Sequence, residues 1–412
     1  MQNQTFKSLL KNPNFVRLWT SQLLSQLTVN LVNFLMLTRI FAATGSTIAV
    51  ALIWISWSLP ALIFGPFSGA LVDSFSRRLM MIVTNLLQSA VIASYFLIKD
   101  HFFALYLIVF AYSLFDQLYI PSQQASLPAL VDKKLLSAAN GIFLLTQQGS
   151  FLLGMGLGGI LLSLLGVDFT IILSSLALFI AAVSVYFLPH DSPLVSAWDK
   201  SLGQFWHEFH QGLNFVKNHR SVLLPLILLV GLQIFISIIA ISLPSYTKNS
   251  LGLDLKHAGI TLLVPGALGA LLFTRSLPKQ LLQQRKKPIV QNGFLLGSIS
   301  LISLALLPFL PRGKLIISVL ISMGLGVSLT AIMVPTQTLL QEKTPPWFRG
   351  RIYSSLGFLM TVATSLPLIL AAALTDILGT SAIMIIMSLI LFATYLFINK
   401  RGDHVLANGF GL

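Results

Sequence analysis

The sequence predicts an all-α polytopic membrane protein with twelve transmembrane helices in two halves of six, and three observations support this fold class. Apolar residues make up 55% of the 412 residues, and only 9% are charged. The mean hydropathy is +0.85. Apolar stretches of about 18 residues or more, long enough to cross a hydrocarbon core, recur along the whole chain. A soluble core could not bury so many apolar side chains.

Charged residues, Pro and Gly mark where the predicted spans end. We expect spans at 15–42, 47–72, 79–98, 102–127, 138–165, 168–188, 221–247, 256–275, 288–309, 314–340, 351–375 and 379–399. The longest connection, 189–220, follows the sixth span. The predicted domains are therefore an N-terminal six-helix bundle at 1–188, a cytoplasmic linker at 189–220 with an amphipathic surface helix, and a C-terminal six-helix bundle at 221–412.

The distribution of Lys and Arg predicts the orientation, because short cytoplasmic loops carry an excess of positive charge. Most basic residues fall in loops that are cytoplasmic if the N-terminus is inside, so we expect both termini in the cytoplasm. The net charge of +14 is spread over these loops, where it can face anionic membrane lipids. We therefore expect no nucleic-acid partner.

Two short polar segments indicate an internal repeat. PSQQASLP begins at Pro121 and PTQTLLQEKTP begins at Pro335, 214 residues later, and each ends a long apolar span before a basic loop. The fourth and tenth spans are therefore predicted to be equivalent helices in two similar halves. Secondary transporters with such repeats bind substrate near the bilayer midplane between the halves.

The loop GALVDSFSRRLM at 69–80 resembles the signature of the major facilitator superfamily. The matching residues are Gly69, Leu71, Asp73, Arg77 and Arg78, whereas Ser74 and Ser76 depart from the pattern. The resemblance implies a conformational latch on the cytoplasmic side, formed by Gly69, Asp73, Arg77, Arg78, Arg349 and Arg351. It also implies a major facilitator fold in which spans 1, 4, 7 and 10 line a central cavity.

Three further segments are similar to one branch of that superfamily, the drug and siderophore exporters that include macrolide efflux proteins. They are NPNFVRLWTSQLLSQL at 12–27, SLPALVDKKLLSAANG at 126–141 and QEKTPPWFRGRIYSS at 341–355. GMGLGG at 154–159 resembles an antiporter motif, and its Gly154, Gly156, Gly158 and Gly159 are also typical of plain helix packing. The resemblance implies a monomer in a bacterial inner membrane.

Polar residues at helical spacing identify the faces of the cavity helices that should avoid lipid. In the first span Gln22, Gln26, Asn30 and Asn33 share a face, and in the fourth span Tyr112, Asp116, Tyr119 and Gln123 do so. The candidate substrate-cavity residues are Gln26, Asn30, Asn33, Arg39, Tyr112, Tyr119, Gln123, Gln233, Ser237, Thr330 and Gln337.

Asp116 is the candidate proton-coupling residue. A charged Asp at a helix centre costs about 2.5 to 3.5 kcal/mol on insertion scales, and removal from water favours the neutral form, so a proton could come and go. Val29 occupies a position where relatives often carry an Asp, so Asp116 is the acid that we place deep in the membrane. Alternatively, Asp116 pairs with Arg39 or contacts a cationic substrate. Arg39 itself could attract an anionic group or extend to the outer headgroups.

The predicted function is a secondary active transporter that exports amphipathic small molecules, a drug or a siderophore, against proton entry. The alternative is a transporter of lipids or lysophospholipids with the same fold. An enzyme is not expected, because the His residues fall in loops or at span edges and no Walker A motif is present. His207 and His210 in WHEFH lack the spacing of a zinc motif, so we expect no metal and no cofactor.

Overall fold

A computed structural model describes residues 8–98, 101–132, 135–191, 210–211, 214–283, 285–310, 312–344 and 349–406. All regular secondary structure in these ranges is helical. The N-terminal helices are α2 (Pro13–Thr44), α3 (Thr47–Ser74), α4 (Arg77–Ala93), α5 (Tyr95–Ile98), α6 (Phe102–Leu130), α7 (Leu136–Phe151), η1 (Leu152–Gly156) and α8 (Leu157–Tyr186). The C-terminal ones are α10 (Arg220–Ser245), η3 (Tyr246–Ser250), η4 (Leu255–His257), η5 (Gly259–Leu263), α11 (Val264–Gln283), α12 (Lys286–Leu306), η6 (Leu307–Phe309), α13 (Lys314–Lys343), α14 (Arg349–Leu378) and α15 (Thr380–Leu406).

Eleven helices within the described ranges are long and apolar enough to cross a membrane. The twelfth predicted span, 138–165, corresponds to α7, the π-helical turn η1 and the first part of α8. Gly166 then interrupts α8 with a φ of 74°, a conformation that glycine adopts without a steric penalty. The predicted all-α membrane fold is therefore confirmed, with eleven candidate spans among the described residues.

The chain forms two compact units. The first contains Met1–Ile40 and Leu52–Phe205, and the second contains Phe41–Ala51 and Trp206–Leu412. The short segment 41–51, where α2 ends and α3 begins, thus packs with the C-terminal helices although both helices otherwise belong to the first unit. Because the predicted linker lies mostly outside the described residues, its amphipathic helix stays a prediction.

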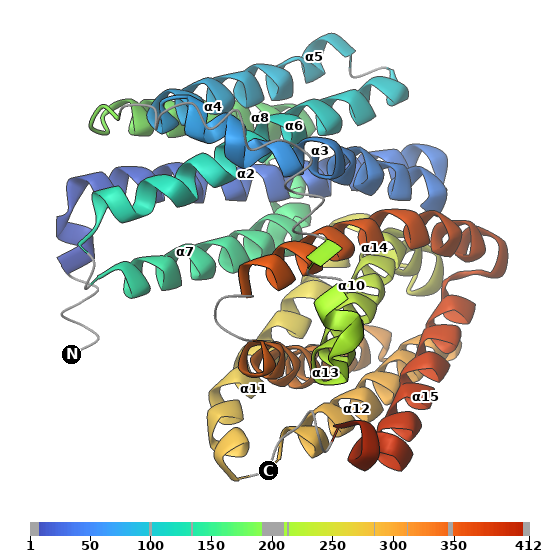
Figure 1. Ribbon diagram of the computed structural model, residues 1–412. Coiled ribbons are helices and arrows are strands. Elements are labelled where there is room, and N and C mark those ends of the chain that lie inside the picture. Colours follow the sequence, from blue (N-terminus) through green and yellow to red (C-terminus); the bar gives the residue numbers. More distant parts are fainter. Residues whose placement is uncertain are drawn as a thin grey trace. The chain divides into compact units, whose positions relative to one another are not determined.

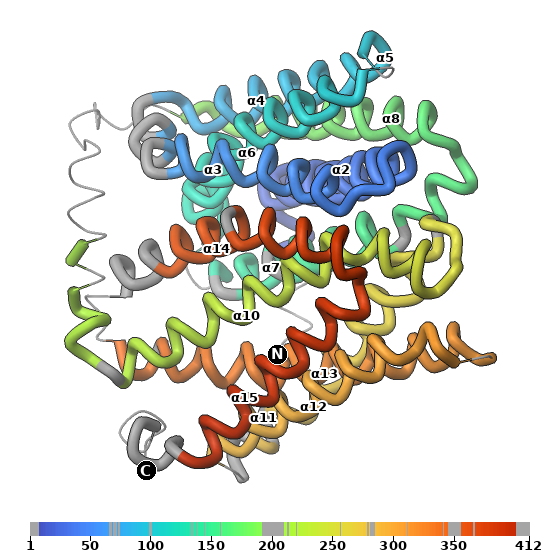
Figure 2. The backbone as a smooth tube through the Cα atoms, turned by 90° about the vertical axis from the view of Figure 1, so that its right-hand side faces the viewer, coloured from blue at the N-terminus to red at the C-terminus, as the bar shows by residue number. Residues whose placement is uncertain are grey.

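The first unit is built around α4, which packs against α6 and α8 (Figure 1), and Figure 2 shows α4 beside α6. A reciprocal serine pair joins α4 to α8. The Ser89 hydroxyl donates to the Ser175 carbonyl oxygen at 2.8 Å, and the Ser175 hydroxyl donates to the Ser89 carbonyl oxygen at 3.0 Å. Each hydroxyl is therefore satisfied by a neighbouring helix rather than left to lipid.

The second unit repeats this arrangement, since α12 packs against α13 and α15. The Ser298 and Ser388 hydroxyl oxygens lie 3.0 Å apart, and the Ser388 hydroxyl also lies 2.9 Å from the Ser298 carbonyl oxygen, which accepts from it. These two serines follow Ser89 and Ser175 by nearly the same number of residues. The shared pair supports the internal repeat predicted from two polar segments.

Within each unit, apolar side chains fill the space between helices and also cover the outer faces. A core of the second unit contains Val290, Phe294, Leu301, Ile332 and Met387, each at most 4% exposed. Outer faces are apolar too, as on α8, where Ile172, Leu176, Ile180 and Val183 are exposed at helical spacing. A face of this kind suits contact with lipid chains.

Glycines bring α11 and α13 into backbone contact inside the second unit. A Cβ atom added at Gly326 would lie 1.7 Å from the Gly266 carbonyl oxygen, and one added at Gly269 would lie 2.0 Å from the Met323 carbonyl oxygen. Small residues are typical of such close helix approaches in membranes, where dispersion contacts between helices provide much of the attraction.

Replacing Gly326 by Ala should lower the unfolding temperature of the purified protein in detergent by a few degrees. The added methyl group meets backbone rather than a movable side chain, and overpacking of this kind costs about 1 to 3 kcal/mol. Gly357→Ala is the matched control, because no atom lies within 4 Å of a Cβ added there. An unchanged unfolding temperature for Gly326→Ala would contradict the close approach.

Candidate functional site

The polar residues of α6 form a buried stripe. Tyr112 and Tyr119 are fully buried, and Asp116 and Gln123 are each 3% exposed. They repeat at intervals of four, three and four residues, which places them on one side of the helix. This side of α6 faces α2 and α4 within the first unit rather than lipid.

Side chains of α2, α4 and α6 together form what we call the buried polar cluster, consisting of Ser21, Asn33, Asn85, Gln88, Tyr112, Asp116 and Tyr119. The Ser21 and Tyr119 hydroxyl oxygens lie 2.9 Å apart, and the Asn85 amide donates to the Ser21 oxygen at 3.2 Å. Elsewhere in the cluster the Gln88 amide donates to the Tyr112 carbonyl oxygen at 3.0 Å, and the Tyr112 hydroxyl donates to Asn33. These bonds hold the two tyrosines on either side of Asp116.

Among the described residues, Asp116 has no cationic partner in this cluster. Its Oδ1 atom is buried and accepts no hydrogen bond from any described residue. No ion pair between Asp116 and a basic side chain occurs among the described residues. A buried carboxylate in such surroundings is costly unless it is neutralised.

Arg39, the basic residue predicted inside the first span, lies elsewhere in the first unit. Its guanidinium donates a hydrogen bond to the Tyr95 hydroxyl and stands 5.1 Å from the centre of the Tyr95 ring. The predicted alternative of an Asp116–Arg39 pair is therefore not the arrangement in this structure. Arg39 instead ties the end of α2 to α5.

Asn85 and Gln88 of α4 belong to the cluster but are absent from the sequence-based candidates. Both are fully buried, and Thr84 and Ser89 on the same helix are nearly so. Their spacing of three and four residues forms a polar stripe that a helical check of the third span would reveal. The stripe escaped the sequence-based candidates because α4 is not one of the helices expected to line a cavity.

The other candidate cavity residues make bonds within their own helices. The Asn30 amide donates to the Gln26 carbonyl oxygen at 2.7 Å, the Ser237 hydroxyl to the Gln233 carbonyl oxygen at 2.9 Å, and the Thr330 hydroxyl to the Gly326 carbonyl oxygen at 3.0 Å. Gln337 is half-buried on α13, and Gln123 buries an amide nitrogen that has no partner among the described residues. Their joint role in a cavity stays a prediction.

The basic residues of the predicted latch make contacts at the start of α4. The Asp191 carboxylate accepts from the Ser76 hydroxyl and the Arg77 backbone amide, both at 2.6 Å, and from the Arg78 amide at 3.3 Å. The Arg77 guanidinium donates to the Ala125 carbonyl oxygen at 2.9 Å, and Arg78 donates to that of Tyr186. The side chains of Gly69, Asp73, Arg349 and Arg351 lie outside the described part of the structure.

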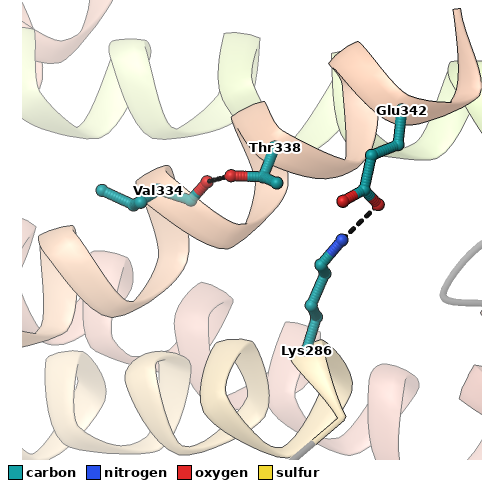
Figure 3. Close-up of polar contacts among 4 residues, drawn as sticks. All are labelled: Lys286, Val334, Thr338 and Glu342. Carbon is teal, nitrogen blue, oxygen red and sulfur yellow. Dashed lines mark hydrogen bonds and ion pairs between the residues drawn. The ribbon is translucent and has the colours of Figure 1, made fainter. Parts of the chain in front are cut away.

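The second unit has a comparable contact at the start of α12. Lys286, the first residue of this helix, forms an ion pair with Glu342 near the end of α13, and one turn earlier the Thr338 hydroxyl donates to the Val334 carbonyl oxygen at 2.9 Å (Figure 3). At the start of α4 the basic residue Arg77 also contacts the end of α6, but it donates to the Ala125 carbonyl oxygen and not to a carboxylate. The two halves thus share this connection as well as the serine pairs.

Within the GMGLGG segment, Gly154 and Gly158 pack closely against α2. A Cβ atom added at Gly154 would lie 2.6 Å from the Cβ atom of Asn30, and one added at Gly158 would lie 2.7 Å from the Phe34 ring. Gly156 and Gly159 are buried on the same segment. These contacts are helix packing within the first unit and do not themselves require antiport.

A helical membrane protein with two repeated units and a buried, polar, uncompensated acid belongs to the class of membrane transporters. The sequence matches the Major Facilitator Superfamily over residues 18–367, so the chain belongs to this family. The predicted family, and a transporter rather than an enzyme, are therefore confirmed.

Relatives within this family include drug exporters. The chain is 24% identical over 383 residues to macrolide efflux protein A of Streptococcus pyogenes, covering 89% of this chain and 90% of that protein. It is 26% identical over 364 residues to the multidrug efflux pump Tap of Mycolicibacterium fortuitum, covering 84% and 85%. The crystal structure of the nucleoside transporter NupG has the same fold, with a TM-score of 0.73 at 12% identity, covering 94% of this chain and 99% of that one.

Replacing Tyr119 by Phe should destabilise the purified protein by about 1 kcal/mol, because the buried hydroxyl bond to Ser21 is lost. Thermal unfolding in detergent measures the effect. Tyr186→Phe is the control, since Tyr186 is 59% exposed. Equal unfolding temperatures for the two variants would show that the bond between Tyr119 and Ser21 contributes nothing.

Proposed function

We propose that the protein exports amphipathic, drug-like molecules from a bacterial cytoplasm in exchange for protons. Macrolide efflux protein A and Tap support the substrate class, since their names describe drug efflux. The excess of Lys and Arg in alternate loops supports an orientation with both termini in the cytoplasm. The unit that works in the inner membrane is a monomer, as expected from the resemblance.

The observation that carries proton coupling is the environment of Asp116. The carboxyl group is buried, and among the described residues its Oδ1 atom has no partner and no basic side chain forms an ion pair with it. Binding a proton removes the cost of holding that charge away from water. A conformation that admits water to the carboxylate would favour proton release, so protonation would bias the equilibrium between two conformations.

Proton entry supplies enough free energy for useful export. At a membrane potential of about 100 mV, one entering proton contributes roughly 2.3 kcal/mol, which corresponds to about a fiftyfold gradient of a neutral substrate.

Tyr112 and Tyr119 do not offer their rings to a substrate in this arrangement, because both are fully buried in the cluster around Asp116. Asp116 is thus proposed as a coupling residue and not as a direct substrate contact.

Replacing Asp116 by Asn should abolish substrate flux driven by a pH gradient in proteoliposomes while leaving substrate exchange without a gradient intact. Asn cannot exchange a proton, but it keeps the shape and hydrogen-bonding capacity of the neutral acid. Asp132→Asn is the control, because Asp132 is an exposed acid just after α6. Undiminished gradient-driven flux in Asp116→Asn would refute the coupling role.

A macrolide is the first substrate to test. Expression of the chain in a host that lacks macrolide exporters should lower accumulation of a radiolabelled macrolide, and collapse of the proton gradient should restore it. A siderophore and a lysophospholipid complete the panel, because the sequence left both classes open. Export of a lysolipid and not of a macrolide would replace the proposed substrate class.

A further inference from the structure

Several side chains of the first unit bury an oxygen atom that has no hydrogen-bond partner among the described residues. Among them are Ser25 of α2, Asn85 and Gln88 of α4, and Asp116 of α6. The first three are fully buried, and Asp116 is 3% exposed. Buried polar atoms are nearly always hydrogen-bonded in folded proteins, so an unpartnered oxygen on each of these side chains calls for a ligand that the chain itself does not supply.

Hydrogen bonds between α4 and α6 place two of these oxygens on either side of Asp116. The Gln88 amide donates to the carbonyl oxygen of Tyr112, one turn before Asp116. Asn85 reaches Tyr119, three residues after Asp116, through a hydroxyl group of α2 that bonds to both. Because Asn85 and Gln88 are three residues apart, they lie on one face of α4, and the Asp116 carboxyl group lies between their two amides.

The position of Ser25 follows from the contacts between α2 and α6. Ser21 meets the Tyr119 hydroxyl, and Asn33 accepts from the Tyr112 hydroxyl, so the two helices run in opposite directions past each other. Ser25 is one turn after Ser21 and shares its side of α2. Its hydroxyl therefore faces α6 near the level of Asp116.

The chemistry of these atoms identifies the ligand. The oxygens of Asn85 and Gln88 and of a charged Asp116 only accept hydrogen bonds, so the ligand must donate. The Gln88 amide has a defined orientation, because its nitrogen faces a carbonyl oxygen that cannot donate. A water molecule donates two hydrogen bonds, and protonated water donates three. The Ser25 hydroxyl can donate or accept, so it suits either form, and buried waters commonly have two to four polar partners.

We propose that Ser25, Asn85 and Gln88 hold a water molecule against Asp116 and that this water delivers the coupled proton. The inference rests on the proposed proton coupling at Asp116 and adds the groups that supply the proton. In this step one O–H bond of protonated water breaks and an O–H bond forms at Asp116 Oδ1, which leaves neutral water and a neutral carboxyl group. Release of the proton reverses the step. The three residues are positioning residues, since they hold the water and carry no proton themselves.

Other ionisable groups near the site do not offer an equal route. Tyr112 and Tyr119 lie on α6 beside Asp116, and their hydroxyl groups are bonded to Asn33 and Ser21. Helices α5 and α7, which also contact α6, contain no charged residue. The arginines of α2 and α4 are bonded to Phe187, Tyr95, Ala125 and Tyr186.

Flux in proteoliposomes tests the positioning role. Ser25→Ala removes a hydroxyl that bonds to no described residue, so the variant should fold. The maximal rate of macrolide flux driven by a pH gradient should fall several-fold with the KM for the macrolide unchanged. The ratio of the rate in ordinary water to that in heavy water should rise, because slower proton delivery then limits the cycle.

Ser242→Ala is the matched control for this flux. Ser242 is 2% exposed and also buries an unpartnered hydroxyl, but it lies on α10 in the second unit, so its loss should leave the rate and the isotope ratio unchanged. An unchanged rate with Ser25→Ala, or an equal fall with both variants, would overturn the proposal. If the wild-type protein moves no macrolide, the proposed substrate fails and the following measurement decides the water site.

Infrared difference spectra between low and neutral pH test the water without a substrate. The carboxyl band of protonated Asp116 is the one that Asp116→Asn removes. Gln88→Met should move this band to higher wavenumber, because a carboxyl group with fewer hydrogen bonds has a stiffer C=O bond, and Ser242→Ala should not. A band that stays in place with Gln88→Met would overturn the water site alone. The lack of any band that Asp116→Asn removes would show that Asp116 binds no proton, which refutes the proposed coupling itself.

Discussion

The absence of water in the hydrocarbon core is the constraint on which the rest of this structure depends. Helices satisfy their own backbone groups, so each remaining polar side chain must find a partner on another helix or on its own backbone. Partners on another helix occur in two pairs among the described residues, Ser89 with Ser175 and Ser298 with Ser388. Hydrogen bonds to the backbone of the same helix are made by Ser237 and Thr330. The Asp116 carboxyl keeps one buried oxygen without a partner among the described residues, and this is the feature on which its proposed coupling role rests.

The helices and the family were predictable because their signals are local. Span lengths, the positions of charges and the loop around Arg77 and Arg78 lie within short windows of sequence. Most observed helices begin and end within a few residues of the expected limits, whereas α11 and α15 run beyond theirs at the C-terminal end. The turn at Gly166 is also local, because glycine between two apolar stretches is a common break.

The contacts of the site were less predictable, because they join residues far apart in the chain. A polar stripe shows that Asp116 avoids lipid, but it cannot show that Asn85 and Gln88 of α4 surround it rather than Arg39 of α2. The acids Asp191 and Asp376 gave no signal at all, since a carboxylate near a helix end in the sequence does not reveal which distant helix it caps. Their partners depend on how the helices pack.

The two serine pairs also bear on how the protein arose. If the two units descend from the duplication of one six-helix ancestor, their sequences have diverged so far that only short segments still match. The serine contact between α4 and α8 recurs between α12 and α15, and loss of a hydroxyl at either place would leave its partner between the helices with one hydrogen bond fewer. Such pairs identify equivalent helix positions, so they can guide the alignment of the two halves in distant relatives whose sequences no longer match.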